Sequence, residues 1–282
     1  MSLPSDFQFS QSSLQDFADC PKRFQLRYLL NMAWPAVETE PIEEHERRIQ
    51  HGLAFHRMVQ QHILGLPEER LSSMATEGDL ARWWAAYRTY RPADLPGTRY
   101  PEVTLTTPVP LPSNDTGARL VAKYDLLVIQ PDSRAVILDW KTSQKRTRSV
   151  TLKNRLQTRV YRYLIVKAGA YLNAGQAFEP EQITMTYWFS DFPDSPERLP
   201  YTTMQYHDDA QYLAGLVAQI AALEQDGFTL TDNEQRCAYC LYRSYCERGV
   251  HAGQIGDLED EPEAETADLL NFDFEQIAEI AF

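Results

Sequence analysis

The sequence predicts an α/β domain in which helices flank a mixed central sheet. The first observation behind this prediction is the order of the expected elements: helices, three strands, a helix, two strands and a last helix. The second is the composition of an ordinary globular domain, with 282 residues of which 43% are hydrophobic and 24% charged. We expect residues 1–250 to form this domain and residues 251–282 to form an acidic, partly disordered tail.

The N-terminal third of the chain is predicted to be helical. Apolar residues recur there near helical spacing, and they begin behind Ser10, which can cap a helix. Pro21 should interrupt the first of these helices, because proline lacks the N–H that a helix interior needs. Helices are expected over residues 10–30, 43–64 and 78–90.

The middle of the chain changes to β-branched and alternating residues, which predict strands. A short turn at residues 131–133 joins two of them into a hairpin. A long helix is expected over residues 153–172, and a further helix behind a cap at Asp208 or Asp209. The strands are expected from residue 102 onward and over residues 118–130, 134–142, 183–190 and 201–206.

Charge is distributed unevenly along the chain. The formal net charge of −13 is unusual for a nucleic-acid enzyme, because phosphate contacts come mainly from Lys and Arg. However, residues 249–282 hold ten acidic and no basic residues, so the remaining chain carries only −3. Residues 141–178 hold nine basic and no acidic residues. We interpret this stretch as a surface for a polyanion. A solvated helix face is the alternative, although such faces usually mix both signs.

Asp125, Asp139 and Lys141 form the candidate catalytic group. Asp139 and Lys141 are two positions apart in a predicted strand, so both side chains point to the same face of the sheet. Asp125 lies among apolar residues of the neighbouring strand, where an unpaired carboxylate is costly and a cation is the usual remedy. Such a group suits Mg²⁺ with its retained waters, and the lysine could orient the attacking water. An ordinary ion-pair network at a sheet edge is the alternative.

Three further side chains are candidates for the same site. Gln157 and Tyr161 share one face of the predicted long helix, inside the basic stretch, and would suit contacts to a DNA backbone. His56 follows Gly52, whose missing side chain lets another segment approach closely, and neutral imidazole can bind Mn²⁺. The competing interpretations are core packing for Tyr161 and a satisfied core histidine for His56.

The four cysteines have the spacing of a metal centre. Cys237, Cys240 and Cys246 form the pattern C-x2-C-x5-C, and Cys20 belongs to the first helix. Thiolates at such spacing can converge on one centre, and Cys20 would tie the first helix to the C-terminal region. Zn²⁺ and a [4Fe-4S] cluster both accept four thiolates, so the residues leave the two open. No signal peptide or membrane span is recognised, so we expect a cytoplasmic protein with reduced cysteines.

Together these motifs resemble the RecB-like branch of the PD-(D/E)XK nucleases. The resemblance is strongest to the iron–sulfur members among CRISPR-associated exonucleases and bacterial helicase–nuclease complexes, and it extends to about Arg248. The opening SQSSLQDFADCPKRFQLRYL matches the family's serine, leucine, cysteine–proline and aromatic pattern, and GLAFH matches its glycine–histidine motif. One departure is Ala122, where the family often has glycine. The remaining motifs correspond to Asp125, to Asp139 with Lys141, and to Gln157 with Tyr161.

The resemblance implies a restriction-endonuclease-like sheet with a helical lobe stapled by a [4Fe-4S] cluster on the four cysteines. It implies catalysis by Asp125, Asp139, Lys141, Gln157 and Tyr161. It also implies hydrolysis of DNA, often as an exonuclease on single strands, in repair, recombination or CRISPR adaptation. The expected ligands of Mg²⁺ or Mn²⁺ are His56, Asp125, Asp139 and the backbone carbonyl of Trp140. The residues expected to contact DNA are Lys145, Arg146, Arg148, Lys153 and Arg155.

The expected partner is DNA that is single-stranded or has a free end. The tail, residues 251–282, mixes carboxylates with apolar residues, and we interpret it as a segment that docks to a protein partner. A DNA mimic that restrains the nuclease and a solvated extension are the alternatives. The alternative function is a catalytically silent DNA-binding or scaffolding subunit of a helicase–nuclease or integration complex. The intact carboxylates and lysine argue against it.

Overall fold

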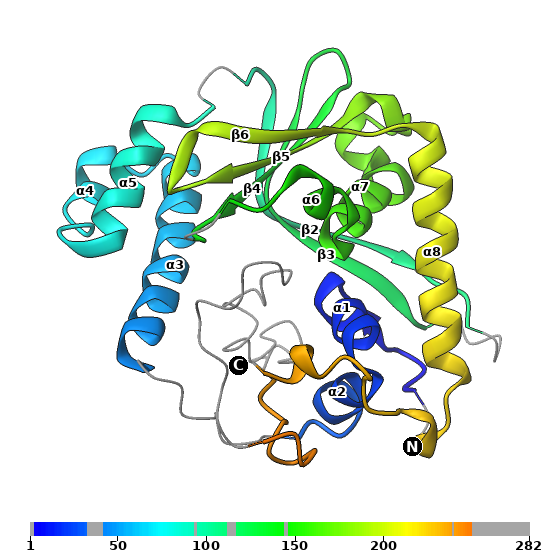
Figure 1. The fold of residues 1–282 in the computed structure, drawn as a ribbon. Helices are drawn as coiled ribbons and strands as arrows, with labels where there is room; N and C mark the ends of the chain where they lie inside the picture. Colours follow the sequence, from blue (N-terminus) through cyan, green and yellow to red (C-terminus); the bar gives the residue numbers. More distant parts are fainter. Residues whose placement is uncertain are drawn as a thin grey trace, which may run out of the picture.

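The computed structural model describes residues 3–32, 42–92, 95–111, 117–143, 146–238 and 240–249. Helices lie on both faces of a central sheet (Figure 1). None of the helices in these ranges is long and apolar enough to cross a membrane. The acidic tail expected over residues 251–282 lies outside the described residues, so the domain boundary near residue 250 stays a prediction.

The described sheet has six strands in the order β1-β3-β4-β5-β6, and β2 also pairs with β3. The β1–β3 and β4–β5 pairs are parallel, whereas β2–β3, β3–β4 and β5–β6 are antiparallel. This mixed sheet with flanking helices confirms the predicted α/β class. The strands are β1 (Gln8–Phe9), β2 (Thr98–Pro108), β3 (Arg119–Ile129), β4 (Ala135–Lys141), β5 (Ile183–Phe189) and β6 (Phe192–Pro200).

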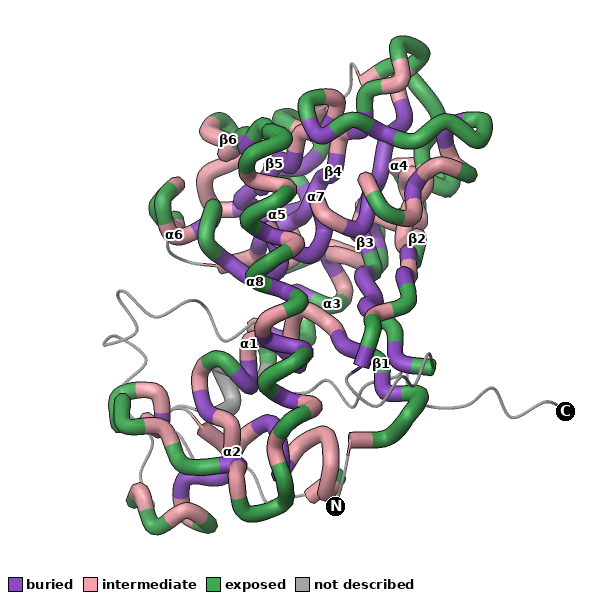
Figure 2. Tube along the Cα trace, turned by 90° about the vertical axis from the view of Figure 1, so that its right-hand side faces the viewer, coloured by how far each residue is buried: buried purple, intermediate pink, exposed green. Residues whose placement is uncertain are grey.

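The two faces of the sheet bury separate apolar clusters. One cluster joins the strands to α1, α7 and α8, and the other joins them to α3, α4 and α5. Figure 2 shows the buried residues concentrated in β3, β4 and β5, between these two layers. The helices are α1 (Gln11–Asp19), α2 (Pro21–Phe24), α3 (Ile42–Ile63), α4 (Glu68–Ser72), α5 (Gly78–Tyr90), α6 (Ser149–Asn154), α7 (Leu156–Ala168) and α8 (Thr203–Ala222).

The N-terminal helical region follows the prediction closely. Ser10 caps α1 and accepts a hydrogen bond from the N–H of Ser13 at 3.1 Å. The helix ends at Cys20, and Pro21 restarts the chain as α2, where its missing N–H costs nothing at the first helical position. The turn Gln25–Leu29 continues it as a π-helix.

The C-terminal part of the described chain returns to α2 (Figure 1, blue and orange segments). The N–H of Lys22 donates to the carbonyl of Thr229 at 3.0 Å, and Gln25 Nε2 donates to the carbonyl of Gln225 at 2.6 Å. The ring of Phe24 stacks on that of Phe228, with centroids 6.1 Å apart. The first helices and the last described residues therefore form one lobe.

The long helix predicted over residues 153–172 is divided. Arg155 adopts an extended conformation between α6 and α7, and a 3-10 turn follows α7. After this break, the apolar residues of α7 pack against the sheet.

Two further predictions near β6 were wrong. Residues 201–206, expected as a strand, instead lead into α8, which Thr202 caps by accepting from Gln205 N at 3.3 Å. Asp209, one of the two expected caps, is only 2% exposed and lies inside the helix. β6 itself was not predicted, because its prolines argue against a strand. An edge strand tolerates proline, and β6 is the edge strand of the sheet among the described residues.

Candidate functional site

The candidate site lies where β3 and β4 separate. Their antiparallel ladder ends at the pair Leu126 and Leu138. One residue further along β3, Asp125 Oδ2 accepts a hydrogen bond from the backbone N–H of Trp140 at 2.9 Å. A carboxylate therefore takes the place of the next backbone acceptor, and Asp125 is held beside the end of β4.

An irregularity between β2 and β3 helps to direct Asp125. The pairing is regular on both sides of Glu102 and Asp125, but these two residues are left out of the register. Glu102 has a φ of +55°, the left-handed conformation that non-glycine residues rarely adopt. Before this point Tyr124 faces the α7 side, whereas Leu126 faces the α3 side. Asp125 stands at the position where the two strands exchange faces.

Asp139 and Lys141 lie on the same side of β4, as their spacing predicted. Lys141 Nζ is 3.0 Å from Asp139 Oδ2. Gln157 on α7 bridges them, because its Nε2 donates to Asp139 Oδ1 at 2.8 Å and its Oε1 accepts from Lys141 at 3.1 Å. All three side chains are buried. In this low-dielectric setting the contacts hold the carboxylate and the ammonium in a defined geometry.

His56 reaches the same point from α3. Its Nδ1 lies 3.4 Å from Asp125 Oδ2. Burial alone would lower the pKa of His56, but the carboxylate of Asp125 outweighs it and raises the pKa above the ordinary value. Burial alone would likewise raise the pKa of Asp125, yet the nearby His56 and the N–H of Trp140 bring it below the ordinary value.

Gly52 explains how α3 comes this close. A Cβ on Gly52 would lie 3.1 Å from Thr142 Oγ1, just after β4. Arg48 secures the same contact from one turn earlier, since its Nη2 donates to the carbonyl of Thr142 at 2.6 Å. The close approach of another segment, expected from the sequence, is therefore made by the residue that follows Lys141.

Tyr161 lies in the core one turn after Gln157. Its side chain is 5% exposed, its ring centroid is 4.8 Å from that of Tyr124, and its carbonyl accepts from Tyr124 Oη at 2.9 Å. These contacts are those of core packing, the competing interpretation of this residue.

Two residues beside Gln157 were missed by the sequence reasoning. Tyr187 on β5 is the in-register neighbour of Asp139, and its hydroxyl lies 3.3 Å from Gln157 Oε1. Thr158 Oγ1 is 2.7 Å from that hydroxyl. In the sequence, the indication for each was a polar residue within a mostly apolar segment. This pattern does not reveal which residues the side chain contacts.

The basic stretch, residues 141–178, is only partly exposed at the surface. Arg146, Arg148 and Lys153 are exposed, and Arg146 pairs with Glu197 at 3.3 Å. Arg155, by contrast, is 8% exposed and donates to Thr147 Oγ1 at 3.3 Å, so its guanidinium is withdrawn from the surface. Lys145 lies outside the described residues.

The oxygen and nitrogen donors at the end of β4 suit a hard divalent cation. Asp125 and Asp139 offer carboxylate oxygens, and His56 offers an imidazole nitrogen, which are ligand types that Mg²⁺ or Mn²⁺ accepts. As they stand, no three His, Cys, Asp or Glu side chains of the described residues are close enough together to hold a metal ion. The donor chemistry fits, and ion binding would have to draw these groups together.

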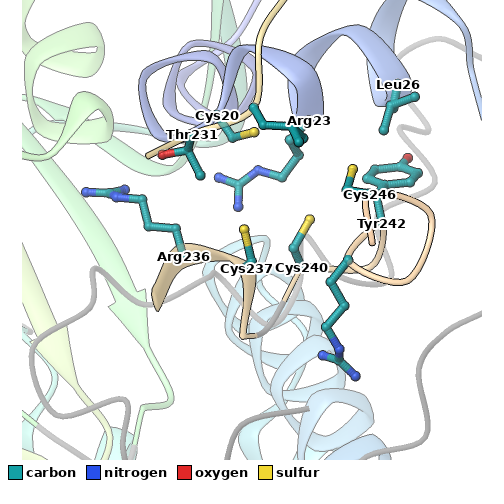
Figure 3. A pocket seen from close by; sticks show the side chains of 11 residues that line it. Cys20, Arg23, Leu26, Thr231, Arg236, Cys237, Cys240, Tyr242 and Cys246 are labelled. Carbon is teal, nitrogen blue, oxygen red and sulfur yellow. The ribbon is translucent and has the colours of Figure 1, made fainter. Parts of the chain in front are cut away.

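The four cysteines line one hollow between α2 and the C-terminal segment. All four are free thiols, and the hollow measures about 320 Å³ with the open space at its mouth. Figure 3 shows sulfurs from both segments around the hollow, with the Arg23 guanidinium reaching between them. Burial raises the pKa of Cys237 and Cys240, and that of Cys246 to about 11. Four thiols are the ligand type that a cluster or Zn²⁺ accepts, but among the described residues these sulfurs are not close enough together, as they stand, to hold a metal ion.

Comparison with known proteins adds the family. The crystal structure of SSO0001 aligns with a TM-score of 0.38 and 11% identity, covering 86% of this chain and 87% of that chain. A structure from Eubacterium rectale, described as a candidate exonuclease, aligns with a TM-score of 0.49 and 12% identity, covering 77% and 80%. No curated protein sequence matches the chain.

The match to a family model is more extensive. The model of the PD-(D/E)XK nuclease superfamily matches residues 8–247. This range contains all six described strands, the group at the end of β4 and the four cysteines. The chain therefore belongs to the PD-(D/E)XK nuclease superfamily.

Proposed function

We propose that the protein is a Mg²⁺- or Mn²⁺-dependent deoxyribonuclease of the RecB-like branch, acting as an exonuclease on single-stranded DNA. The observation that carries this proposal is the pairing of Asp139 with Lys141 at 3.0 Å, in a nuclease-family chain, beside the Asp125–His56 pair. Acid and base groups from β3, β4 and α3 thus lie in the same region of the sheet.

His56, Asp125, Asp139 and the carbonyl of Trp140 are the proposed ligands of the cation. When bound, such an ion polarises the scissile phosphate and lowers the pKa of water. The Trp140 N–H holds Asp125 in place, and Gln157 holds Asp139, so the two carboxylates have little freedom to turn away.

Lys141 is the proposed partner of the attacking water. Its ammonium is held by Asp139 and Gln157, and it can exchange one of its contacts for a hydrogen bond to the water. The water oxygen attacks phosphorus and loses a proton to the solvent, while the bond from phosphorus to the leaving oxygen breaks and that oxygen takes up a proton from the solvent. The ammonium offsets the negative charge that develops. Tyr161 is assigned a supporting role, because its ring packs against that of Tyr124 in the core, one helical turn after Gln157.

DNA would be held by exposed basic residues around α6. Arg146, Arg148 and Lys153 are exposed, and they precede Gln157 in the chain. Such contacts recognise phosphates and not bases, which is appropriate for an enzyme that degrades strands of any sequence. We leave Arg155 out of this surface because its guanidinium is withdrawn.

The four cysteines are proposed to hold a [4Fe-4S] cluster, with Zn²⁺ as the alternative. The cluster would have a structural role, because it would join α2 to the last described segment of the chain. Its assignment rests on the four free thiols around one hollow and on the resemblance to iron–sulfur nucleases. Brown colour, iron content and absorbance near roughly 400 nm would distinguish iron from zinc.

A nuclease assay tests the proposed activity. End-labelled single-stranded DNA is incubated with Mg²⁺ or Mn²⁺ and wild type, Asp139→Ala, Lys141→Ala or Asp132→Ala. Asp132 is the matched control, since its side chain is 58% exposed at the turn of the same hairpin. We expect both active-site variants to lose at least about 100-fold in rate and the control to retain full rate. Equal rates in all four would defeat the catalytic assignment, and the absence of cleavage by wild type would favour the silent DNA-binding subunit.

Substrate form and partners need separate experiments. Circular single-stranded DNA should resist an exonuclease, and duplex DNA should be degraded more slowly than single strands. The helicase-associated and CRISPR-associated roles both need a partner, and we assign partner docking to residues 251–282. Deletion of these residues should leave DNA cleavage by the isolated protein intact and abolish the capture of a helicase or integration subunit.

A further inference from the structure

Tyr187 lies next to the proposed catalytic group without belonging to any of its motifs. It is the in-register neighbour of Asp139 across the parallel β4–β5 pair, and its side chain is fully buried on the α7 side of the sheet. Phenylalanine would fill the same space. The presence of the hydroxyl must therefore be explained by the groups to which it is hydrogen-bonded, since burying a hydroxyl without hydrogen bonds is costly.

The hydroxyl of Tyr187 has two partners on α7. It lies 2.7 Å from Thr158 Oγ1 and 3.3 Å from Gln157 Oε1. Thr158 Oγ1 is also 2.5 Å from the carbonyl of Leu152, to which it donates. Each hydroxyl has one hydrogen. Tyr187 can therefore donate to Thr158 while Thr158 donates to the carbonyl of Leu152. Alternatively, Tyr187 can donate to Gln157 while Thr158 still donates to the carbonyl of Leu152.

The second arrangement leaves no carbonyl unsatisfied. The carbonyl of Leu152 keeps the hydrogen of Thr158 at 2.5 Å and also accepts the N–H of Arg155 at 3.3 Å. Gln157 Oε1 has two lone pairs, and Lys141 supplies a hydrogen to one of them at 3.1 Å. Tyr187 is placed to supply a hydrogen to the other.

This geometry affects how firmly Gln157 is held when Lys141 turns toward a substrate. If Lys141 weakens its bond to Gln157, the amide oxygen still has Tyr187 as a donor. Gln157 Nε2 can then remain on Asp139 at 2.8 Å. The ring of Tyr187 adds a second contact, because its centroid lies 5.7 Å from Lys141 Nζ. Burial raises the pKa of Tyr187, so the hydroxyl keeps its hydrogen at neutral pH.

We propose that Tyr187 is a positioning residue that keeps Gln157, and through it Asp139, in place, with Thr158 as the partner that shares its hydroxyl hydrogen. The proposal rests on the proposed nuclease function for its kinetic consequence. Its structural part, the restraint of the Gln157 amide, does not depend on activity.

The kinetic test is Tyr187→Phe, which removes the hydroxyl and keeps the ring beside Lys141. We expect kcat on single-stranded DNA to fall about tenfold, as for one lost hydrogen bond, while KM for DNA and the Mn²⁺ concentration for half-maximal rate stay unchanged. The matched control is Tyr201→Phe, another buried tyrosine, whose hydroxyl bonds Asp209 at 2.9 Å. It should lose stability without losing kcat.

A double variant with Gln157→Ala distinguishes a positioning role of Tyr187 from a general loss of stability. In Gln157→Ala the amide is gone, so adding Tyr187→Phe should lower kcat no further. A full additional tenfold loss, or wild-type kcat in Tyr187→Phe itself, would overturn the proposal. If instead Asp139→Ala cleaves DNA as fast as wild type, the proposed function fails, and the kinetic test no longer applies.

A spectroscopic test decides the structural part in either case. Selective ¹⁵N labelling of glutamine allows hydrogen exchange of the Gln157 side-chain amide to be followed, with Gln157→Ala identifying its signal. We expect faster exchange in Tyr187→Phe and unchanged exchange in Tyr201→Phe. Equal protection in wild type and Tyr187→Phe would show that Tyr187 does not restrain Gln157.

Discussion

Asp125 Oδ2 accepts the backbone N–H of Trp140 at 2.9 Å, one residue beyond the last ladder pair of β3 and β4. The carboxylate therefore has a structural role in closing the strand pair and a proposed role as a metal ligand. The two roles make different demands, since only the second requires a negative charge.

Substitution of Asp125 should separate these roles. Asp125→Asn keeps an oxygen for the Trp140 N–H but loses the charge beside His56, so we expect a small loss of stability and a loss of at least about 100-fold in DNA cleavage. Asp125→Leu should in addition lower the free energy of unfolding by about 1–3 kcal/mol, because a buried N–H loses its acceptor. Urea denaturation and the nuclease assay check both. Normal cleavage by Asp125→Asn would contradict the metal-ligand role.

Two helix glycines offer a comparison of close and open surroundings. A Cβ on Gly215 in α8 meets no described atom within 4 Å, whereas one on Gly52 in α3 meets Thr142 Oγ1 at 3.1 Å. Alanine is favoured over glycine in helix interiors by up to about 1 kcal/mol. We expect Gly215→Ala to raise the melting temperature and Gly52→Ala to raise it less or lower it. A larger gain for Gly52→Ala would show that α3 does not press on the end of β4.

Asp209 should be important for stability and unimportant for chemistry. It accepts from Arg159 at 2.8 Å and from Tyr201 at 2.9 Å, and lies 3.6 Å from Arg162, which is 2% exposed. Asp209→Asn removes the charge that compensates these arginines and should cost about 3 kcal/mol in unfolding free energy. The neighbouring, exposed Asp208 gives the control, because Asp208→Asn should change stability by less than about 0.5 kcal/mol. Equal effects would contradict the buried-pair interpretation.

His62 should make stability depend on pH. Its Nδ1 lies 3.1 Å from Tyr87 Oη, and burial, followed by the charge of Arg91, lowers its pKa below 6.5. The neutral ring therefore fits the folded state better than the charged ring. As pH falls below 6.5, the unfolded chain takes up a proton that the folded chain resists, so wild type loses stability.

The variant His62→Gln cannot titrate, and it isolates this effect. We expect it to be less stable than wild type at pH 8, by about 1 kcal/mol for the altered contact with Tyr87. The difference should shrink at pH 5.5, since only wild type loses the contribution of the neutral ring. All other histidines are common to both proteins. A difference that stays constant or grows on acidification would show that the pKa of His62 is not lowered.

Loss of one cysteine should release the proposed cluster. Cys237→Ser should abolish colour and bound iron and lower the melting temperature, because the joint between α2 and the C-terminal segment would open. Metal analysis with absorbance spectroscopy checks this on protein prepared without air. A wild-type protein with neither iron nor zinc, and a Cys237→Ser variant of equal stability, would contradict the staple.

The sequence predicted best those features that depend on local pattern. The hairpin of β3 and β4 was predicted within one residue at all four strand ends, since alternating apolar residues flank a short turn. The shared face of Asp139 and Lys141 followed from the same alternation. Their roles, like those of Gln157 and Tyr161, stay predictions until activity is measured.

The missed features depend on contacts between distant segments. Alternation places Tyr187 on one face of β5 but cannot reveal that β5 pairs with β4 in the register that sets it beside Asp139. The exchange of faces at Asp125 needs the left-handed Glu102 of another strand. Asp209 was predicted as a helix cap because the arginines that pair with it lie about fifty positions earlier in the sequence, on α7.

The outer edge of β6 has a consequence for behaviour at high concentration. Pro193, Pro196 and Pro200 remove three N–H donors from this strand, and Asp194, Glu197 and Arg198 place charges between them. An exposed strand edge can recruit strands from other molecules and start aggregation, and prolines and charges oppose this. The same residues that concealed β6 from prediction should therefore protect the sheet against edge-to-edge association.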